Sequence, residues 1–121
     1  MSISGKTRVF AVAGAPVTHS LSPAMHNGWY TDHGLDAVYV ALPVAPHAAA
    51  ETFAHAFDLG LQGLNITVPF KEAAARAAVS LDPAAAHLEA ANVLVPQEKG
   101  WLGLNTDAPG FVVNLDETTP G

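Results

Sequence analysis

The chain has 121 residues, of which half are hydrophobic and 13% are charged, and its formal net charge is −6 at pH 7. This composition excludes disorder as the main state, and the length suffices for one domain with one core. The negative charge argues against nucleic acid as a partner, because phosphate binding needs a basic face. Since the chain has no cysteine, it can form neither disulfides nor thiolate metal sites.

The sequence gives no indication of membrane insertion or export. No apolar run approaches the ~20 residues that a membrane-spanning helix needs. The beginning, MSISGKTRVF, lacks the charged region and the long apolar region that are typical of a secretory signal. We therefore expect a cytoplasmic protein without a membrane partner.

The first half of the chain alternates strand and helix patterns. Residues 7–13, TRVFAVA, are a short β-prone run that is followed by a loop rich in Gly, Pro, Ser and Thr. Ser22 as N-cap, with proline after it, predicts a helix over residues 22–33 that a glycine ends. Residues 36–44 predict a second strand, and residues 46–60 predict a second helix.

The second half continues the alternation. Residues 62–68, QGLNITV, predict a third strand that is buried on both faces, and Pro69 then begins a third helix. Asp82, followed by proline, predicts the cap of a short fourth helix. Two further β-prone pieces joined by PQEKG predict a hairpin, and Thr106 or Asp107 is expected to cap a last helix. The expected ranges are 69–79 and 82–90 for the two helices, 91–95 and 101–105 for the hairpin, and 106–115 for the last helix.

Strands that alternate with helices over short loops predict the α/β class. We expect a three-layer α/β/α open sheet that is mostly parallel, with the hairpin as an antiparallel element. Ligands of such sheets bind beyond the carboxyl ends of the strands. A site is therefore expected at that edge of the sheet.

Three loops place polar side chains at this edge: those after the first strand, after the third strand and after the hairpin. Lys71 is notable because it is one of only five Lys and Arg residues and directly follows the apolar run NITVPF. A cation in the first turn of a helix also opposes the helix dipole, so a purely structural role is less expected there. The candidate residues are His19, Ser20, Ser22, Thr67, Lys71, Asn92, Asn105, Thr106 and Asp107.

Most candidates also have a purely structural interpretation. Ser22 and Asp107 are typical helix caps, and Asn65 and Asn92 are typical turn or sheet-edge amides. The six histidines show no metal-ligand spacing, so no metal site is predicted. There is also no G-x-G-x-x-G, Walker or G-x-S-x-G motif, so nothing in the chain is expected to hold a dinucleotide pyrophosphate.

Four ordered motifs resemble the substrate-binding half of shikimate dehydrogenases. GAPVTHSLSPAMHN resembles the family's G-x-P-[IV]-x-H-S-x-S-P-x-x-H-N opening, and GLNITVPFKE resembles its G-x-N-[VI]-T-[VI]-P-[FY]-K element. AANVLV and GLNTDAPGF resemble its G-A-V-N-T-[IL] and G-x-N-T-D-x-x-G-[FL] segments. The similarity spans residues 8–115, and four motifs in order are far more specific than any one of them. The sequence departs from the family pattern at Ala91 and Val93, where Val and Thr are common.

The resemblance implies that a set of polar residues binds the substrate. The two serines would hydrogen-bond the carboxylate of shikimate, and the amide and hydroxyl side chains would meet ring hydroxyls or order the site. The implied substrate-binding residues are Ser20, Ser22, Asn65, Thr67, Lys71, Asn92 and Asp107.

The resemblance also implies the chemistry. Lys71 and Asp107 would be the catalytic pair in the NADP-dependent, reversible reduction of 3-dehydroshikimate to shikimate, a step of chorismate and aromatic amino-acid biosynthesis. NADP would be bound mainly by a Rossmann-type domain that follows in the family, with Thr106 at most adjacent to it. We expect residues 1–121 to be the substrate-binding domain without that second domain, and to be inactive alone.

Two alternatives share the same pocket. A shikimate- or quinate-binding module without catalysis would need neither Lys71 nor Asp107, so their presence argues against it. A quinate/shikimate dehydrogenase is the other alternative, and Ser22 in place of threonine favours shikimate. In the family the last helix continues toward the second domain. We therefore expect an uncovered apolar end, and self-association or a homodimer through Phe111, Val112, Val113 and Leu115.

Overall fold

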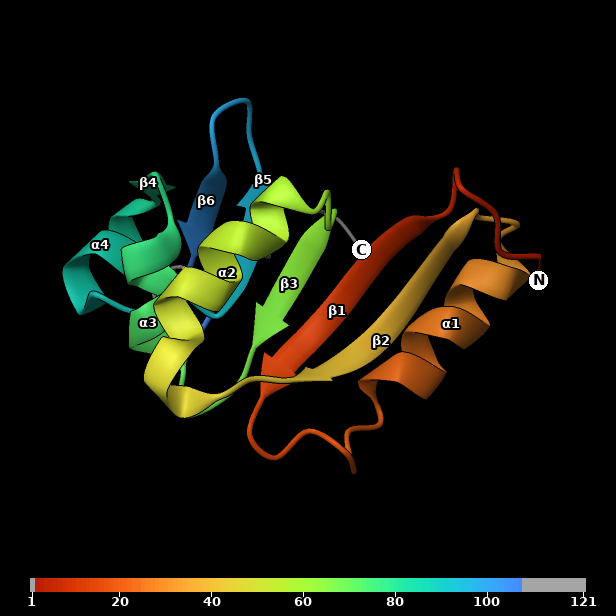
Figure 1. The fold of residues 1–121 in the computed structure, drawn as a ribbon, viewed down its shortest axis with the longest axis horizontal. Coiled ribbons are helices and arrows are strands. Elements are labelled where there is room, and N and C mark those ends of the chain that lie inside the picture. Colours follow the sequence, from red (N-terminus) through yellow and green to blue (C-terminus); the bar gives the residue numbers. More distant parts are fainter. Residues whose placement is uncertain (1, 108–121) are drawn as a thin grey trace.

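The structure is a computed structural model, and it describes residues 2–107. One six-stranded sheet has the order β2-β1-β3-β5-β6-β4, with helices on both of its faces (Figure 1). The strands are β1 (Arg8–Gly14), β2 (Ala37–Pro43), β3 (Gly63–Ile66), β4 (Ser80–Leu81), β5 (Val93–Pro96) and β6 (Trp101–Leu104). The helices are α1 (Ser22–Asp32), the 3₁₀ turn η1 (Pro46–Ala48), α2 (Ala49–Asp58), α3 (Lys71–Ala77) and α4 (Pro83–Leu88).

The sheet is mixed, as the sequence predicts. Strand β1 pairs in parallel with β2 and β3, and β4 pairs in parallel with β6. Strand β5 is antiparallel to both β3 and β6, so the predicted hairpin is confirmed. Three of the five pairings are therefore parallel, and the expected α/β class is confirmed.

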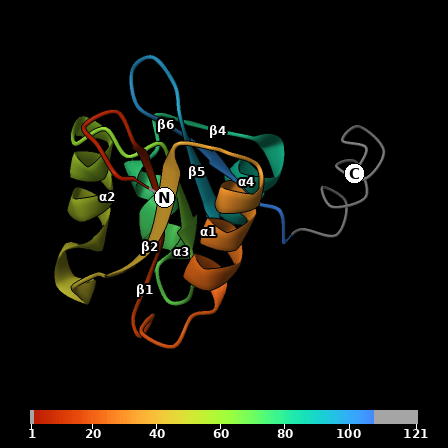
Figure 2. The same ribbon diagram turned by 90° about the vertical axis from the view of Figure 1, so that its right-hand side faces the viewer.

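The two faces of the sheet carry different cores. Helices α1 and α2 lie on opposite sides of it (Figure 2). Alternate residues of β1 divide between them: Ala11 and Ala13 join the core under α2, α3 and α4, whereas Val12 joins the smaller core under α1. The first core also contains the largest fully buried side chains, which are Trp101, Phe53 and Leu94.

The start of α1 differs from the expectation. The N-cap is Leu21, with no side-chain cap, and Ser22 is the first residue of the helix. The Ser20 hydroxyl accepts a hydrogen bond from the Ser22 backbone N–H at 3.2 Å, which occupies a donor of the first turn. The Ser22 hydroxyl is therefore not used as a helix cap. Gly34 has a φ of 64°, as expected of a glycine that follows a helix.

The third strand is shorter and less buried than predicted. It covers Gly63–Ile66, and the side chain of Asn65 is exposed between the buried Leu64 and Ile66. Because the Asn65 side chain is exposed, the expectation that this strand is buried on both faces is wrong. The following turn also moves the helix start, since the Phe70 N–H donates to the Thr67 carbonyl and α3 begins only at Lys71.

After α3, the structure contains the predicted fourth helix and one strand that the sequence pattern does not predict. The Asp82 carboxylate caps α4 by accepting a hydrogen bond from the Ala85 N–H at 2.7 Å. Strand β4 was not predicted, because two residues carry no periodic pattern. The last predicted helix and its apolar end, residues 106–115, fall almost entirely outside the described residues, so their role in self-association stays a prediction.

Candidate active site

The carboxyl ends of β1, β2 and β3 meet at one edge of the sheet (Figure 1). The loop after β1 leads to Ser20 and Ser22, and the loop after β3 leads to Thr67 and Lys71. The Thr67 N–H donates to the Ala13 carbonyl at 3.0 Å, which joins the two loops where they leave the sheet. The predicted site edge is thus present, with its first two loops side by side.

A glycine permits this close approach. A Cβ atom added to Gly14 would collide with the Thr67 hydroxyl and would lie 2.8 Å from a methyl carbon of Val17. The Thr67 hydroxyl also lies 3.3 Å from the Ala13 carbonyl, to which it donates. The GAP sequence after β1 therefore sets the position of Thr67 by leaving room for it.

Lys71 and Asp107 form an ion pair at this edge. The Nζ atom of Lys71 lies 2.5 Å from Oδ2 of Asp107, and their side chains are 31% and 53% exposed. The Lys71 carbonyl accepts a hydrogen bond from the Ala91 N–H at 2.8 Å, which fixes the first turn of α3 against the start of the hairpin. The pair is held on the protein side and remains accessible from the other side.

Asn92 connects the strands around this pair. Its N–H donates to Leu104, and its carbonyl accepts from Ile66, so its backbone lies between β6 and β3. Its side-chain Nδ2 donates to the Thr106 hydroxyl at 2.7 Å and to Oδ1 of Asp107 at 3.2 Å. Its Oδ1 accepts from the Thr106 N–H at 3.0 Å. This side chain therefore orients the carboxylate that holds Lys71.

The buried Asn105 supports the same segment. Its Oδ1 accepts from the Asp107 N–H at 2.9 Å, and its Nδ2 donates to the Ala90 carbonyl at 2.9 Å. Asn105 is the one buried polar residue of the described chain, at 3% exposed. A buried amide with both ends used fixes the backbone that carries Asp107.

The serine loop lies at the same edge of the sheet but makes different contacts. Ser20 and Ser22 are half-buried, whereas His19 is exposed. Within residues 2–107, no hydrogen bond joins either serine to Lys71, Asn92 or Asp107. The predicted residues thus form two separate groups at one edge of the sheet. Lys71, Asn92 and Asp107 bond to one another, and, in the part of the chain that the structure describes, the two serines do not bond to them.

Asn65 has a partner that sequence reasoning missed. Its Oδ1 accepts a hydrogen bond from the Tyr39 hydroxyl at 2.6 Å. Tyr39 lies in the middle of β2, in the apolar run AVYVALP, where an aromatic residue is expected to be core. The sequence carries no signal for this contact, because it depends on the pairing of β2 with β1 and of β1 with β3.

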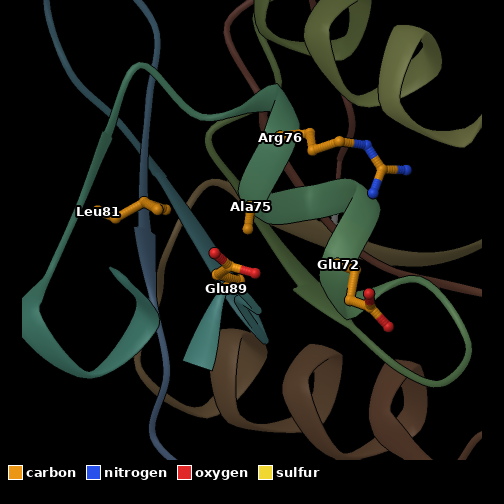
Figure 3. Close-up of a pocket in the computed structure, with 5 residues that line it drawn as sticks. All are labelled: Glu72, Ala75, Arg76, Leu81 and Glu89. Carbon is orange, nitrogen blue, oxygen red and sulfur yellow. The ribbon is translucent and has the colours of Figure 1, made fainter. Parts of the chain in front are cut away.

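A hollow of about 320 Å³ lies elsewhere, against α3 and α4. It is lined by two glutamates, Glu72 and Glu89, together with Ala75, Arg76 and Leu81. The Arg76 side chain points away from Glu89 (Figure 3), so these charges do not converge on one point. None of the predicted site residues lines this hollow, and its chemistry indicates no ligand.

Residues 2–107 contain no group of three or more His, Cys, Asp or Glu that could hold a metal ion. In the same range, no helix is long and apolar enough to span a membrane. The chemistry of the described edge is therefore that of hydroxyl, amide, ammonium and carboxylate groups.

Residues 12–94 match the family described as the shikimate dehydrogenase substrate binding domain. The chain belongs to this family. The shikimate dehydrogenase (NADP(+)) of Anaeromyxobacter sp. (strain K) is 50% identical over 107 residues, which are 88% of this chain and 38% of that protein. That of Hyphomonas neptunium is 47% identical over 91% of this chain and 41% of that protein.

Solved structures of shikimate dehydrogenases share the fold of this domain. One in complex with NADP+ has a TM-score of 0.83 and 36% identity, over 96% of this chain and 40% of that one. The enzyme from Thermus thermophilus in complex with NADP(H) and shikimate has a TM-score of 0.77 and 37% identity, over 92% of this chain and 42% of that one. The substrate-binding domain described here thus spans roughly two fifths of the length of these relatives.

Proposed function

We propose that residues 1–121 are the substrate-binding domain of an NADP-dependent shikimate dehydrogenase, and that they supply its catalytic side chains. The whole protein reduces 3-dehydroshikimate to shikimate, reversibly, in the cytoplasm, as a step of aromatic amino-acid biosynthesis. One observation carries the proposal: the ion pair of Lys71 and Asp107, which Asn92 orients, stands at the carboxyl edge of the sheet. Relatives named shikimate dehydrogenase (NADP(+)) support it.

The residues of this chain do not fit the pyrophosphate of NADP. The sequence has no glycine fingerprint between a strand and a helix. The loop after β1 has its closest backbone approach at Gly14, and there the Thr67 hydroxyl fills the space. We therefore assign the cofactor to a part of the whole protein outside this chain.

In this proposal the chain's own residues bind and orient the substrate and hold a proton. Ser20 and Ser22 donate hydrogen bonds to the substrate carboxylate, while the other polar residues meet the ring oxygens: Asn65, Thr67, Lys71, Asn92 and Asp107. Lys71 carries the proton nearest the reacting oxygen and stabilises the negative charge that develops there. Asp107 holds the Lys71 ammonium in place by their ion pair.

The test compares two cation substitutions in the full-length protein that contains this chain. Lys71→Ala should lower kcat for shikimate oxidation with NADP by at least ~10²-fold, the scale of a lost general acid or key charge. Arg76→Ala, an exposed cation on the same helix, is the matched control and should leave kcat within about twofold. Both variants should unfold at nearly the wild-type temperature.

Three outcomes would contradict the proposal in different ways. Near-normal turnover of Lys71→Ala would show that the lysine is not catalytic. Turnover of quinate in preference to shikimate would show that quinate, and not shikimate, is the substrate. Shikimate binding by calorimetry without any turnover of the wild-type protein would indicate a binding module instead of an enzyme.

A further inference from the structure

Helix α1 holds Tyr39 through two consecutive residues, His26 and Asn27. The Tyr39 backbone N–H donates to Oδ1 of Asn27, and the Tyr39 carbonyl accepts from Nδ2 of Asn27, both at 2.8 Å. The His26 ring stacks on the Tyr39 ring with centroids 4.0 Å apart and planes 9° apart. The Nδ1 atom of His26 in turn lies 2.9 Å from the Ser22 carbonyl. Tyr39 is only 3% exposed, so both its backbone and its ring are fixed.

The Tyr39 side chain, held by Asn27 and His26, places its hydroxyl against Asn65. It donates to Oδ1 of Asn65 at 2.6 Å. Burial raises the pKa of Tyr39 to about 12, repulsion from Tyr30 adds to the rise, and the Ser22 side chain opposes it. The phenol therefore stays protonated near neutral pH. Its hydroxyl group donates a hydrogen bond to Asn65.

This direction of donation decides which way the Asn65 amide faces. With Oδ1 turned toward Tyr39, the Nδ2 group must point to the other side. Asn65 is exposed, and its Nδ2 makes no hydrogen bond within residues 2–107. Two N–H donors are thus presented at the surface, one residue from Ile66 and two from Thr67, where β3 ends.

We propose that Tyr39 is a positioning residue that fixes the Asn65 amide so that its N–H groups meet an oxygen of the substrate. This inference rests on the proposed function and adds to it. The atom bound at Asn65 is an acceptor, a hydroxyl or carbonyl oxygen on the ring of a polyhydroxylated carboxylate. Ser22 lies on the same helix as Asn27 and His26, so a shift of α1 moves both the serine and the residues that hold Tyr39.

Tyr30 is a second buried tyrosine in the core under α1, and it serves as a comparison for Tyr39. Tyr30 packs against the rings of Phe10, His26 and Trp29. It is 8% exposed, but its hydroxyl makes no hydrogen bond within residues 2–107. Tyr30→Phe is therefore a matched control, because it removes a hydroxyl from the same core without touching Asn65.

The experiment measures steady-state kinetics of the full-length protein with shikimate. Tyr39→Phe should raise KM about 3- to 10-fold, the scale of one hydrogen bond, with kcat changed less than about twofold. Tyr30→Phe should leave both constants within about twofold. In an Asn65→Ala background, Tyr39→Phe should have no further effect on KM, because its target is gone. An unchanged KM in Tyr39→Phe, or an equal rise in both backgrounds, would overturn the proposal.

A ligand-free measurement separates this proposal from the proposed function. In ¹H–¹⁵N spectra of the full-length protein, the Asn65 side-chain amide should give two well-separated proton signals, and Tyr39→Phe should move them toward free-amide values. If wild-type protein fails to oxidise shikimate, the proposed function fails, while this spectral change still tests the contact. Unchanged Asn65 signals in Tyr39→Phe would overturn the role of Tyr39.

A third variant covers the case in which Tyr39→Phe does not fold. Asn65→Asp keeps an acceptor for the Tyr39 hydroxyl but has no N–H group to offer at neutral pH. Its KM for shikimate should rise at least about tenfold. A wild-type KM in Asn65→Asp would show that no N–H donor is used at this position.

Discussion

The two faces of the sheet carry cores that differ in residue composition and in the contacts that they make. The face under α2, α3 and α4 is packed mainly by alanines around larger apolar side chains, the largest fully buried ones being Trp101, Phe53 and Leu94. The face under α1 is a small core of Val12, Tyr30, Ala37 and Tyr39. Its contacts include hydrogen bonds from α1 to β2 and from β2 to β3.

This difference indicates that the first face mainly stabilises the fold, whereas the second face mainly positions the Asn65 side chain. Alanines allow helices to approach the sheet closely, so the first face buries most of the core of residues 2–107. It meets the carboxyl edge of the sheet mainly through backbone groups, such as the Ala13 carbonyl and the Ala91 N–H. The second face buries less but connects α1, Tyr39 and Asn65 to that edge. Substitutions in the first face should therefore change folding more than KM, and substitutions in the second face should do the reverse.

The largest effect should come from Trp101. It is 1% exposed, and its indole N–H donates to the buried carbonyl of Phe53 at 2.7 Å. Trp101→Ala should lower the free energy of unfolding by about 3–5 kcal/mol, because it leaves a cavity and an unpaired carbonyl. Trp29, on the outer side of α1, is 54% exposed, so Trp29→Ala should cost less than about 1 kcal/mol. Urea denaturation of both variants checks this contrast, and equal losses would contradict it.

The ion pair should show the next largest effect, on activity instead of folding. Lys71→Ala and Asp107→Asn should each lower kcat, by about 10²-fold for the lysine, or roughly 2.7 kcal/mol. The double variant should lose less than the product of the two losses, since the side chains act as one unit. Multiplicative losses in kcat would show that the two residues act separately.

Gly14→Ala should affect both stability and the site. The added methyl group must displace the Thr67 hydroxyl and the Val17 side chain. We expect a loss of about 1–3 kcal/mol in stability, the usual cost of overpacking, together with a raised KM for shikimate. Gly28→Ala is the control, because a Cβ there has open space around it. A Gly14→Ala variant with wild-type stability and KM would mean that Thr67 moves at no cost.

The smallest effect concerns alkaline pH. The pKa of Tyr39 rises from 10.0 to about 12 on folding, chiefly through burial. The folded protein therefore keeps its proton where the unfolded chain loses it, and stability that is full below pH 10 falls as the pH rises toward 12. The slope from this group is at most about 1.4 kcal/mol per pH unit. Urea titrations across this range should show a flatter decline for Tyr39→Phe, and an identical decline would contradict the shift.

Most of the fold could be predicted from local patterns. Alternating strand and helix signals, with proline and glycine at their ends, indicate β1, α1, β2, α2, β3 and the hairpin within a few residues of their observed bounds. The misses have local causes. The hydroxyl of Ser20 satisfies the Ser22 N–H, a turn delays α3 to Lys71, and β4 is too short to give a periodic pattern.

The sequence by itself determined the residue types of the candidate site and their order. Lys71 and Asp107 follow β3 and β6 within a few residues, and Asn92 directly precedes β5; the carboxyl edge of an α/β sheet is where such residues meet. Only the tertiary structure decided which of them touch. The ion pair of Lys71 with Asp107 crosses 36 residues, and the hydrogen bond from Tyr39 to Asn65 crosses 26. Contacts of this range depend on strand order and register, which a local pattern does not contain, because pairing energy arises only when the strands are assembled side by side.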